Sequence, residues 1–281
     1  MQSDAENTNQ ESGFDKDSIL GTFIVAGVLC LVCSLVVSTA AVALKPLQEK
    51  NAENKKKRNV LAAAGFWDSK EHTNEDIPKL FEPIETVLVN LPSGEDDADA
   101  GTLNTELNAD TYDQKKAAKD PERNLQIDAS DDVADIKRRA RVAEAYLVKS
   151  ESGKIETIVL PVYGKGLWST LYGFLALDGD GKTVKGITFY EHGETPGLGG
   201  EVDNPKWKAL WPGTEAINSE GQVVLDVAKP GNATQDNQVD GLSGATITSN
   251  GVENTVKYWL GDQAFGPFLE RIRNNKLASA N

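Results

Sequence analysis

The chain is poor in the residues from which metal sites and disulfide frameworks are built. Its 281 residues include only two cysteines and two histidines. Both cysteines, Cys30 and Cys33, lie inside one apolar run, so no disulfide framework is available. A zinc or iron–sulfur site would need two further ligands beside this C-x-x-C pair. Cysteine also packs in apolar helices as an ordinary small apolar residue. We therefore expect no metal site.

Positive charge is scarce as well. The chain has 29 Lys and Arg residues against 43 Asp and Glu residues, for a net charge of −14. Such a surface repels a phosphate backbone, so nucleic acid is not an expected partner. A serine hydrolase is also disfavoured, because no histidine is placed by its spacing as a base for Ser243.

One long uncharged run stands near the start of the chain. Ile19 to Leu44 contains no charged residue and would form a helix of roughly 39 Å, enough to cross a bilayer core of about 30 Å. A cleavable signal peptide is the rival, since Ala41-Val42-Ala43 has the small-x-small form, but the run is too long and acidic residues precede it. We predict a retained transmembrane helix at 19–44, after a polar tail at 1–18.

The remainder divides at about residue 140. Residues 45–140 should form a helical stalk and a mixed segment with an acidic insertion at about 93–130, and residues 141–281 are denser in strand signal. The elements expected before residue 144 are a helix at Lys45–Ala64 ended by Gly65, a strand within Leu80–Pro92, a solvated loop at Ser93–Ala118 and a helix at Asp131–Ala143.

The second half predicts an antiparallel sheet. Asp178 to Lys182 is a clear hairpin connection between two runs of strand-forming residues. Consecutive strands on short turns, followed by two late helices that would cover one face, indicate an α+β fold. The expected elements are strands at Ile155–Tyr163, Leu171–Leu177, Val184–Tyr190 and Val223–Val227, then helices at Val252–Leu260 and Phe268–Asn275.

One stretch combines tight glycine turns, hydroxyl side chains and a helix start. It runs from Asp240 to Gly251 and reads D-G-L-S-G-A-T-I-T-S-N-G. Asn250 could cap the following helix, and Glu253 completes a capping-box spacing. The amides and the dipole of a helix start favour an anion. The hydroxyls could therefore bond a phosphate or be esterified to one, although Ser/Thr/Gly turns that merely cap a helix are common.

The pattern D-x-x-S-G-A-T at Asp240, Ser243, Gly244, Ala245 and Thr246 is more specific. It resembles the motif of the FMN-binding domain family, found in the flavin-bearing subunits of the Na⁺-translocating NADH:quinone reductase (Nqr) and in the G subunit of the related Rnf complex. In that family, flavin mononucleotide (FMN) is joined to the last threonine of the motif through a phosphoester. The resemblance thus implies covalent FMN on Thr246.

Two further stretches could wall a flavin ring. The turn at Gly164–Ser169 presents Trp168, and the glycine-rich loop at His192–Glu201 contains Glu194, Thr195, Leu198 and Gly199. A planar ring needs a narrow slot with apolar walls and a few backbone donors. Taken singly, a lone tryptophan usually packs in a core, and a Gly/Pro loop is usually only a turn. Both stretches resemble the C subunit of the sodium-translocating reductase.

The resemblance implies an electron carrier of the bacterial inner membrane. It implies an oxidoreductase subunit of the six-subunit complex that passes electrons from NADH towards ubiquinone, coupled to Na⁺ export. The implied partners are an iron–sulfur donor, a second FMN-bearing subunit as acceptor and a flavin-attaching enzyme. The alternatives are the flavin subunit of an Rnf-type complex and a membrane-anchored assembly module without a redox role.

Charge and resemblance disagree on orientation. Six basic residues follow the apolar run between Lys45 and Arg58, while only Lys16 precedes it. The positive-inside rule would keep the large C-terminal part in the cytoplasm. The resemblance implies that the FMN domain is periplasmic, and we follow it because the charge rule is a tendency that partner subunits can override.

Overall fold

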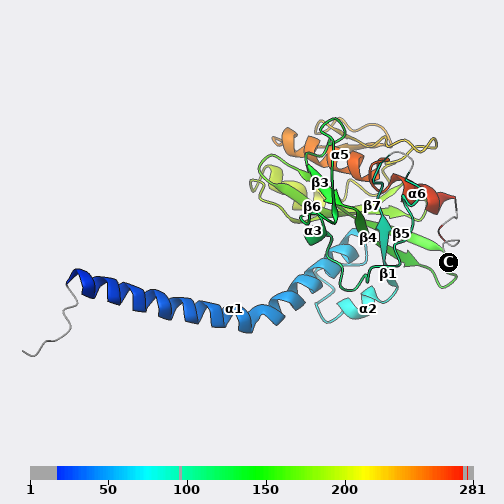
Figure 1. Cartoon of the computed structure of the whole chain (residues 1–281). Helices are drawn as coiled ribbons and strands as arrows, with labels where there is room; N and C mark the ends of the chain where they lie inside the picture. Colours follow the sequence, from blue (N-terminus) through cyan, green and yellow to red (C-terminus); the bar gives the residue numbers. More distant parts are fainter. Residues whose placement is uncertain (1–17, 95–96, 275–276, 278–281) are drawn as a thin grey trace, which may run out of the picture. The chain divides into compact units, whose positions relative to one another are not determined.

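The structure is a computed structural model that describes residues 18–94, 97–274 and 277 (Figure 1). Most of the expected polar tail at 1–18 lies outside the described residues. The chain splits into two compact units, Met1–Glu53 and Asn54–Asn281, and each is treated by itself.

Helix α1 (Ile19–Ala63) begins in the first unit and ends in the second. Its apolar part reaches a mean hydropathy of 2.7 over 18 residues, of which only 6% are buried. Among the described residues, it is the one helix long and apolar enough to cross a membrane. The helix continues through the charged stalk, as the sequence predicts, and the chain then turns at Gly65, where φ is +81°.

The second unit is built on a five-stranded antiparallel sheet with the order β1-β4-β5-β6-β7. The hairpin of β5 and β6 is the longest pairing, with a register that runs from Thr157 opposite Asp178 to Lys165 opposite Thr170. The strands are β1 (Ile84–Asn90), β4 (Val142–Lys149), β5 (Ile155–Lys165), β6 (Thr170–Asp178) and β7 (Val184–Glu191).

Helices cover both faces of this sheet (Figure 1). Alternate residues of a strand point to opposite faces, so Leu175 packs in the larger core and Phe174 in the smaller one. The larger core includes α5 (Thr246–Leu260) and α6 (Gly266–Arg273), and the smaller one includes the end of α1 and α2 (Ile77–Phe81). The predicted α+β class is confirmed, and the end of α1, within the second unit, covers the face that the sequence left open.

Helix α5 lies unusually close to β5. A Cβ atom on Gly251 would overlap the carbonyl oxygen of Lys165, and one on Gly164 would overlap the hydroxyl of Thr255. The absence of side chains at these two positions thus allows the helix backbone to approach the strand. This contact fixes the beginning of α5 relative to the turn after β5.

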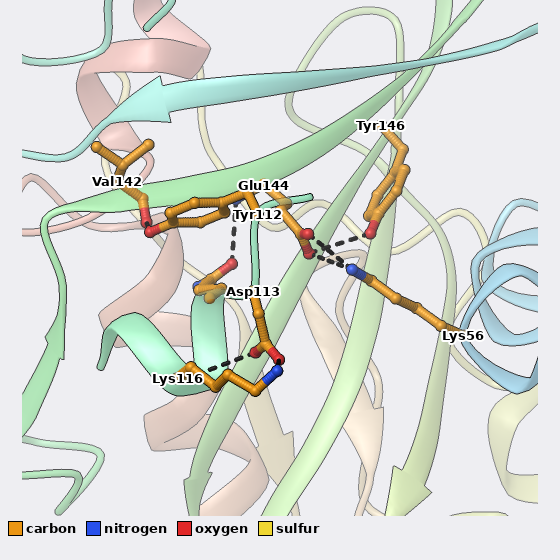
Figure 2. Close-up of polar contacts among 8 residues, drawn as sticks. Lys56, Tyr112, Asp113, Lys116, Val142, Glu144 and Tyr146 are labelled. Carbon is orange, nitrogen blue, oxygen red and sulfur yellow. Dashed lines mark hydrogen bonds and ion pairs between the residues drawn. The ribbon is translucent and has the colours of Figure 1, made fainter. Parts of the chain in front are cut away.

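A half-buried ion pair joins the last turns of α1 to β4 (Figure 2). The Lys56 Nζ lies 2.7 Å from each carboxylate oxygen of Glu144, whose side chain is only 5% exposed. The Tyr146 hydroxyl donates to the same carboxylate at 3.2 Å, and the Glu144 amide donates to Gln114 at 3.1 Å. Burial and the Glu144 charge hold the pKa of Tyr146 well above its ordinary value.

The smaller elements lie in the connections. The strands β2 and β3 form an antiparallel pair, and β8 and β9 form a parallel pair. These elements are β2 (Asn124–Gln126), β3 (Arg138–Ala140), β8 (Asp226–Ala228), β9 (Gln238–Asp240), α3 (Gln114–Ala117), α4 (Pro205–Lys208) and the 3-10 helix η1 (Gly199–Asp203).

The helix predicted at Asp131–Ala143 is wrong. The Asp132 carboxylate accepts hydrogen bonds from the amides of Ile136 at 2.9 Å and Lys137 at 2.7 Å, which replaces helical bonding with a side-chain turn. Asp135 and Lys137 adopt positive φ, and the chain then enters β3 and β4. Strand β4 contains the helix formers Ala143 and Ala145, so its strand state is imposed by pairing on both sides.

The acidic stretch expected as a solvated loop is irregular but partly docked. It contains turns and the short α3, and it includes exposed residues such as Asp99. Gly101, with φ of +74°, leaves no room for a side chain against Pro267. The Arg271 guanidinium donates to the carbonyls of Ala100 at 3.0 Å and Ala98 at 3.2 Å.

Candidate functional site

Thr246 is the first residue of α5, and its side chain is exposed. The helix therefore begins earlier than predicted. Asn250 lies inside the helix, so the predicted Asn250 cap and its capping box with Glu253 are wrong. Glu253 instead pairs with Lys257. The earlier start is fixed by Ser249, whose hydroxyl accepts from the Leu242 amide at 2.8 Å and donates to the Ala245 carbonyl at 3.1 Å.

The first turn of α5 offers free backbone donors. Ala245 is the N-cap residue and gives no side-chain cap. Among the described residues, the amides of Thr246, Ile247 and Thr248 have no hydrogen-bond acceptor. Gly244 precedes them with φ of +72°. An exposed hydroxyl thus stands beside three unbonded amides at the positive end of a fifteen-residue helix, which is an arrangement suited to a phosphate group.

Glu194 joins the three segments that surround this helix start. Its buried carboxylate accepts a hydrogen bond from the Thr248 hydroxyl at 2.7 Å. It also accepts from the backbone amides of Trp168 at 2.9 Å, Ser169 at 3.1 Å and Leu167 at 3.2 Å. Burial raises the pKa of Glu194, but these hydrogen bonds outweigh burial and hold it below its usual value. The carboxylate is therefore ionised at neutral pH.

Small residues allow the three segments to approach one another. A Cβ on Gly166 would come within 2.7 Å of the Glu194 carboxylate, and one on Gly199 within 2.5 Å of the Thr248 hydroxyl. A Cβ on Gly244 would lie 3.3 Å from the Leu198 side chain. The turn after β5, the glycine-rich loop and the start of α5 therefore form one site.

Apolar side chains remain exposed on these segments. Trp168 is 67% exposed, whereas Trp207, Trp211 and Trp259 are buried in the core. Leu198 is 45% exposed. Core packing, the ordinary role of a tryptophan near a turn, is thus excluded for Trp168. Large apolar groups left in solvent beside unbonded amides suit an aromatic ligand with an anionic group. The same surface includes Leu167 and Ile247.

Three of the predicted site residues contribute through the backbone or stabilise turns, and a fourth is an exposed hydroxyl. Asp240 accepts from the amides of Asn232 and Ala233, each at 3.0 Å, so its carboxylate fixes a neighbouring turn. The Thr195 carbonyl accepts from the amides of Leu198 and Gly200 and closes the glycine-rich loop. Ala245 is the N-cap residue. Ser243 is exposed three residues before Thr246, as a second accessible hydroxyl.

Sequence reasoning missed Thr248, Ile247 and Leu167. Thr248 is 1% exposed and supplies the shortest hydrogen bond to Glu194. The only local signal was the T-x-T spacing of Thr246 and Thr248, which places one hydroxyl outward and one inward once the helix starts at Thr246. That start was itself mispredicted, so the pairing could not be seen.

Comparison with known proteins indicates the same part of the chain. A family model described as an FMN-binding domain matches residues 166–261, which include the glycine-rich loop, the start of α5 and most of the turn after β5. Fold and site therefore define the class as a protein with an FMN-binding domain.

The relatives identify the family. The C subunit of the Na⁺-translocating NADH-quinone reductase from Vibrio alginolyticus is 47% identical over 266 residues, covering 94% of this chain and 98% of that protein. The same subunit from Yersinia pestis is 44% identical, covering 94% and 96%. The crystal structure of NqrC from Shewanella oneidensis is 34% identical with a TM-score of 0.69, covering 79% and 99%. The chain belongs to the NqrC family, the C subunits of Na⁺-translocating NADH-quinone reductases, and the Rnf alternative is not favoured.

Proposed function

We propose that this chain is the electron-carrying C subunit of a Na⁺-translocating NADH:ubiquinone reductase and that it holds FMN through a phosphoester to Thr246. The observation that carries the proposal is the exposed Thr246 hydroxyl at the first position of α5. It lies beside backbone amides that donate no hydrogen bond to any described residue. The N-terminus of a helix stabilises a phosphate through these donors and through its dipole.

The surrounding residues fit the rest of the cofactor. Trp168 and Leu198 expose apolar surface from two loops on which a planar ring could rest. The ionised Glu194 supports the site indirectly, because its hydrogen bonds hold the turn that carries Trp168 against α5. FMN, when bound, supplies reversible transfer of one or two electrons, and the protein supplies its attachment and orientation. A covalent link would keep the carrier from losing its cofactor.

The partners follow from the family and from the resemblance of the motifs. An iron–sulfur centre of a membrane subunit would donate electrons, and a second FMN-bearing subunit would accept them on the way to quinone. A flavin-attaching enzyme would form the phosphoester. Sodium would move elsewhere in the complex, because the run from Ile19 to Leu44 carries no charged residue.

We place the chain in the bacterial inner membrane as a single-pass protein with its FMN domain in the periplasm. The length and apolar character of α1 support the anchor. The periplasmic side rests on the resemblance, because the flavin-attaching enzyme of such complexes works outside the membrane. The charges between Lys45 and Arg58 favour the other orientation.

Replacement of the proposed attachment residue tests the proposal. Denatured wild-type protein from a host with the flavin-attaching enzyme should fluoresce as flavin on a gel, and Thr246→Ala should abolish this signal. Thr234→Ala is the matched control, since it removes another exposed threonine hydroxyl, outside the D-x-x-S-G-A-T motif, and should retain full fluorescence. Fluorescence that survives Thr246→Ala would place the link elsewhere. Colourless wild-type protein would favour a non-redox assembly module.

A further inference from the structure

A cavity of about 480 Å³ adjoins the turn after β5, with which it shares Lys165, and its lining does not include Thr246. It is lined by residues from three parts of the chain: the end of α3 with the residues just after it, the turn before β3, and the β5–β6 hairpin. We call it the basic cavity. Its basic lining residues are Lys115, Lys119, Lys137, Arg138 and Lys165.

The charge of this cavity is opposite to that of the whole chain, which carries −14. Among the described residues that line the cavity, Asp135 is the one acidic residue. Lys115 lies 2.7 Å from Glu191 and 3.5 Å from the centre of the Tyr172 ring, so it is partly neutralised. Three of the bases make no side-chain hydrogen bond or ion pair with any described residue, and these are Lys119 after α3, Lys137 on the turn and Arg138 at the start of β3.

A buried phenol lines the same cavity. Tyr163 is 9% exposed, and its hydroxyl is buried without a hydrogen-bond partner among the described residues. Burial, with the neighbouring hydroxyl of Tyr258, raises the pKa of Tyr163, so the hydroxyl stays protonated and can donate. An unsatisfied buried hydroxyl costs free energy. A ligand that accepts this hydrogen bond would recover that cost.

The turn that carries three of the lining residues is held in a strained conformation. Asp135 and Lys137 have φ of 48° and 64°. No other non-glycine residue among those described has a positive φ. The strain is maintained by the Asp132 carboxylate, which accepts from the amides of Ile136 and Lys137. Such strain persists where the surrounding structure imposes it, often at ligand sites. Here it places Lys137 and Arg138 at the cavity.

We infer that the basic cavity is a binding site for a phosphate group of a small molecule. Unpaired cations and a protonated phenol together supply the donors that a polyvalent oxyanion accepts. The volume falls within the range of ordinary small-ligand sites, roughly 300–1,000 Å³. The lining does not include Thr246, so the inference does not rest on the proposed flavin link.

Titration of the full-length protein with pyrophosphate at low ionic strength, followed by calorimetry, tests this inference. Wild-type protein should give saturable one-site binding. Lys137→Gln should weaken it by about tenfold, and Tyr163→Phe by roughly fivefold, because each removes one donor to the anion. Tyr163→Phe should not lower the thermal stability, since the hydroxyl has no partner to lose among the described residues.

Controls separate a built site from diffuse attraction and from the flavin site. Lys154→Gln removes the same charge at an exposed turn outside the cavity and should leave pyrophosphate affinity unchanged. Thr246→Ala should also leave it unchanged. Glycerol 3-phosphate, tested in parallel, would bind more tightly than pyrophosphate if the natural ligand is a lipid headgroup. Absence of saturable binding, or equal losses from Lys154→Gln and Lys137→Gln, would overturn the inference.

Discussion

Glu194 joins parts of the chain that are far apart in sequence. Its carboxylate bonds to Thr248, 54 residues further on, and to the turn at Leu167–Ser169. The sequence placed Glu194 in a candidate flavin loop but could not reveal this role, because no local pattern links a loop to a helix start in another segment. The Thr246 motif, by contrast, is contiguous, and a contiguous pattern can be read from a single chain.

Replacement of this carboxylate should destabilise the site in a pH-dependent manner. Glu194→Gln should lower the unfolding free energy at pH 7 by about 1–3 kcal/mol, because a neutral amide accepts the backbone hydrogen bonds more weakly. The pKa of Glu194 is lowered in the folded state. Its contribution is therefore present above the ordinary carboxyl pKa and is lost as the pH falls through the folded pKa.

Chemical denaturation of the full chain in detergent at pH 7 and at about pH 3 measures this effect. The difference between wild type and Glu194→Gln should shrink at the lower pH. Glu191→Gln is the control, since Glu191 forms an exposed pair with Lys115 and should change stability by less than about 1 kcal/mol. A difference that stays constant with pH would contradict the assigned role of the charge.

Among the elements, the position of α5 depends on its close approach to β5. Gly251→Ala should lower the unfolding free energy by about 1–3 kcal/mol, because the added methyl group would overlap the Lys165 carbonyl. The neighbouring Asn250→Ala is the control. Asn250 is exposed on the same helix, and alanine is the better helix former, so stability should be unchanged or slightly higher. Equal effects at the two positions would show that helix propensity, and not the contact, is responsible.

The half-buried pair of Lys56 and Glu144 should hold the end of α1 on the sheet (Figure 2). Lys56→Met should lower the unfolding free energy by about 1–3 kcal/mol, less than for a fully buried pair, because the Lys56 side chain is 42% exposed. Lys149→Met is the matched control, since its partner Glu85 is half exposed and can return to water. An equal loss of unfolding free energy for Lys149→Met and Lys56→Met would contradict this role of the Lys56–Glu144 pair.

The prediction of elements succeeded where the local pattern was strong and failed where distant pairing decided the outcome. The β5–β6 hairpin and its neighbour β7 follow from runs of β-branched and aromatic residues. Strand β4 was missed because its alanines favour a helix when taken alone. The turn at Asp132–Lys137 was read as helix, since the side-chain hydrogen bonds that break it cannot be seen in composition.

At the scale of the whole molecule, the membrane orientation predicted from charge differs from the one that the family resemblance implies. A C-terminal alkaline phosphatase fusion should be active in the native host, because this enzyme folds only in the periplasm. A fusion of the same reporter before Ile19 should be inactive. The opposite pair of results would follow the positive-inside rule for Lys45–Arg58 and would refute the proposed periplasmic domain.

The central claim is a covalent bond between Thr246 and FMN, and the mass of protein purified from its own organism tests it most directly. The mass of the intact protein should exceed the mass of its amino-acid chain by the mass of one FMN minus one water. The peptide that contains Thr246 should carry the whole of this increment. Intact protein with the bare amino-acid mass, or the increment on another peptide, would contradict the account.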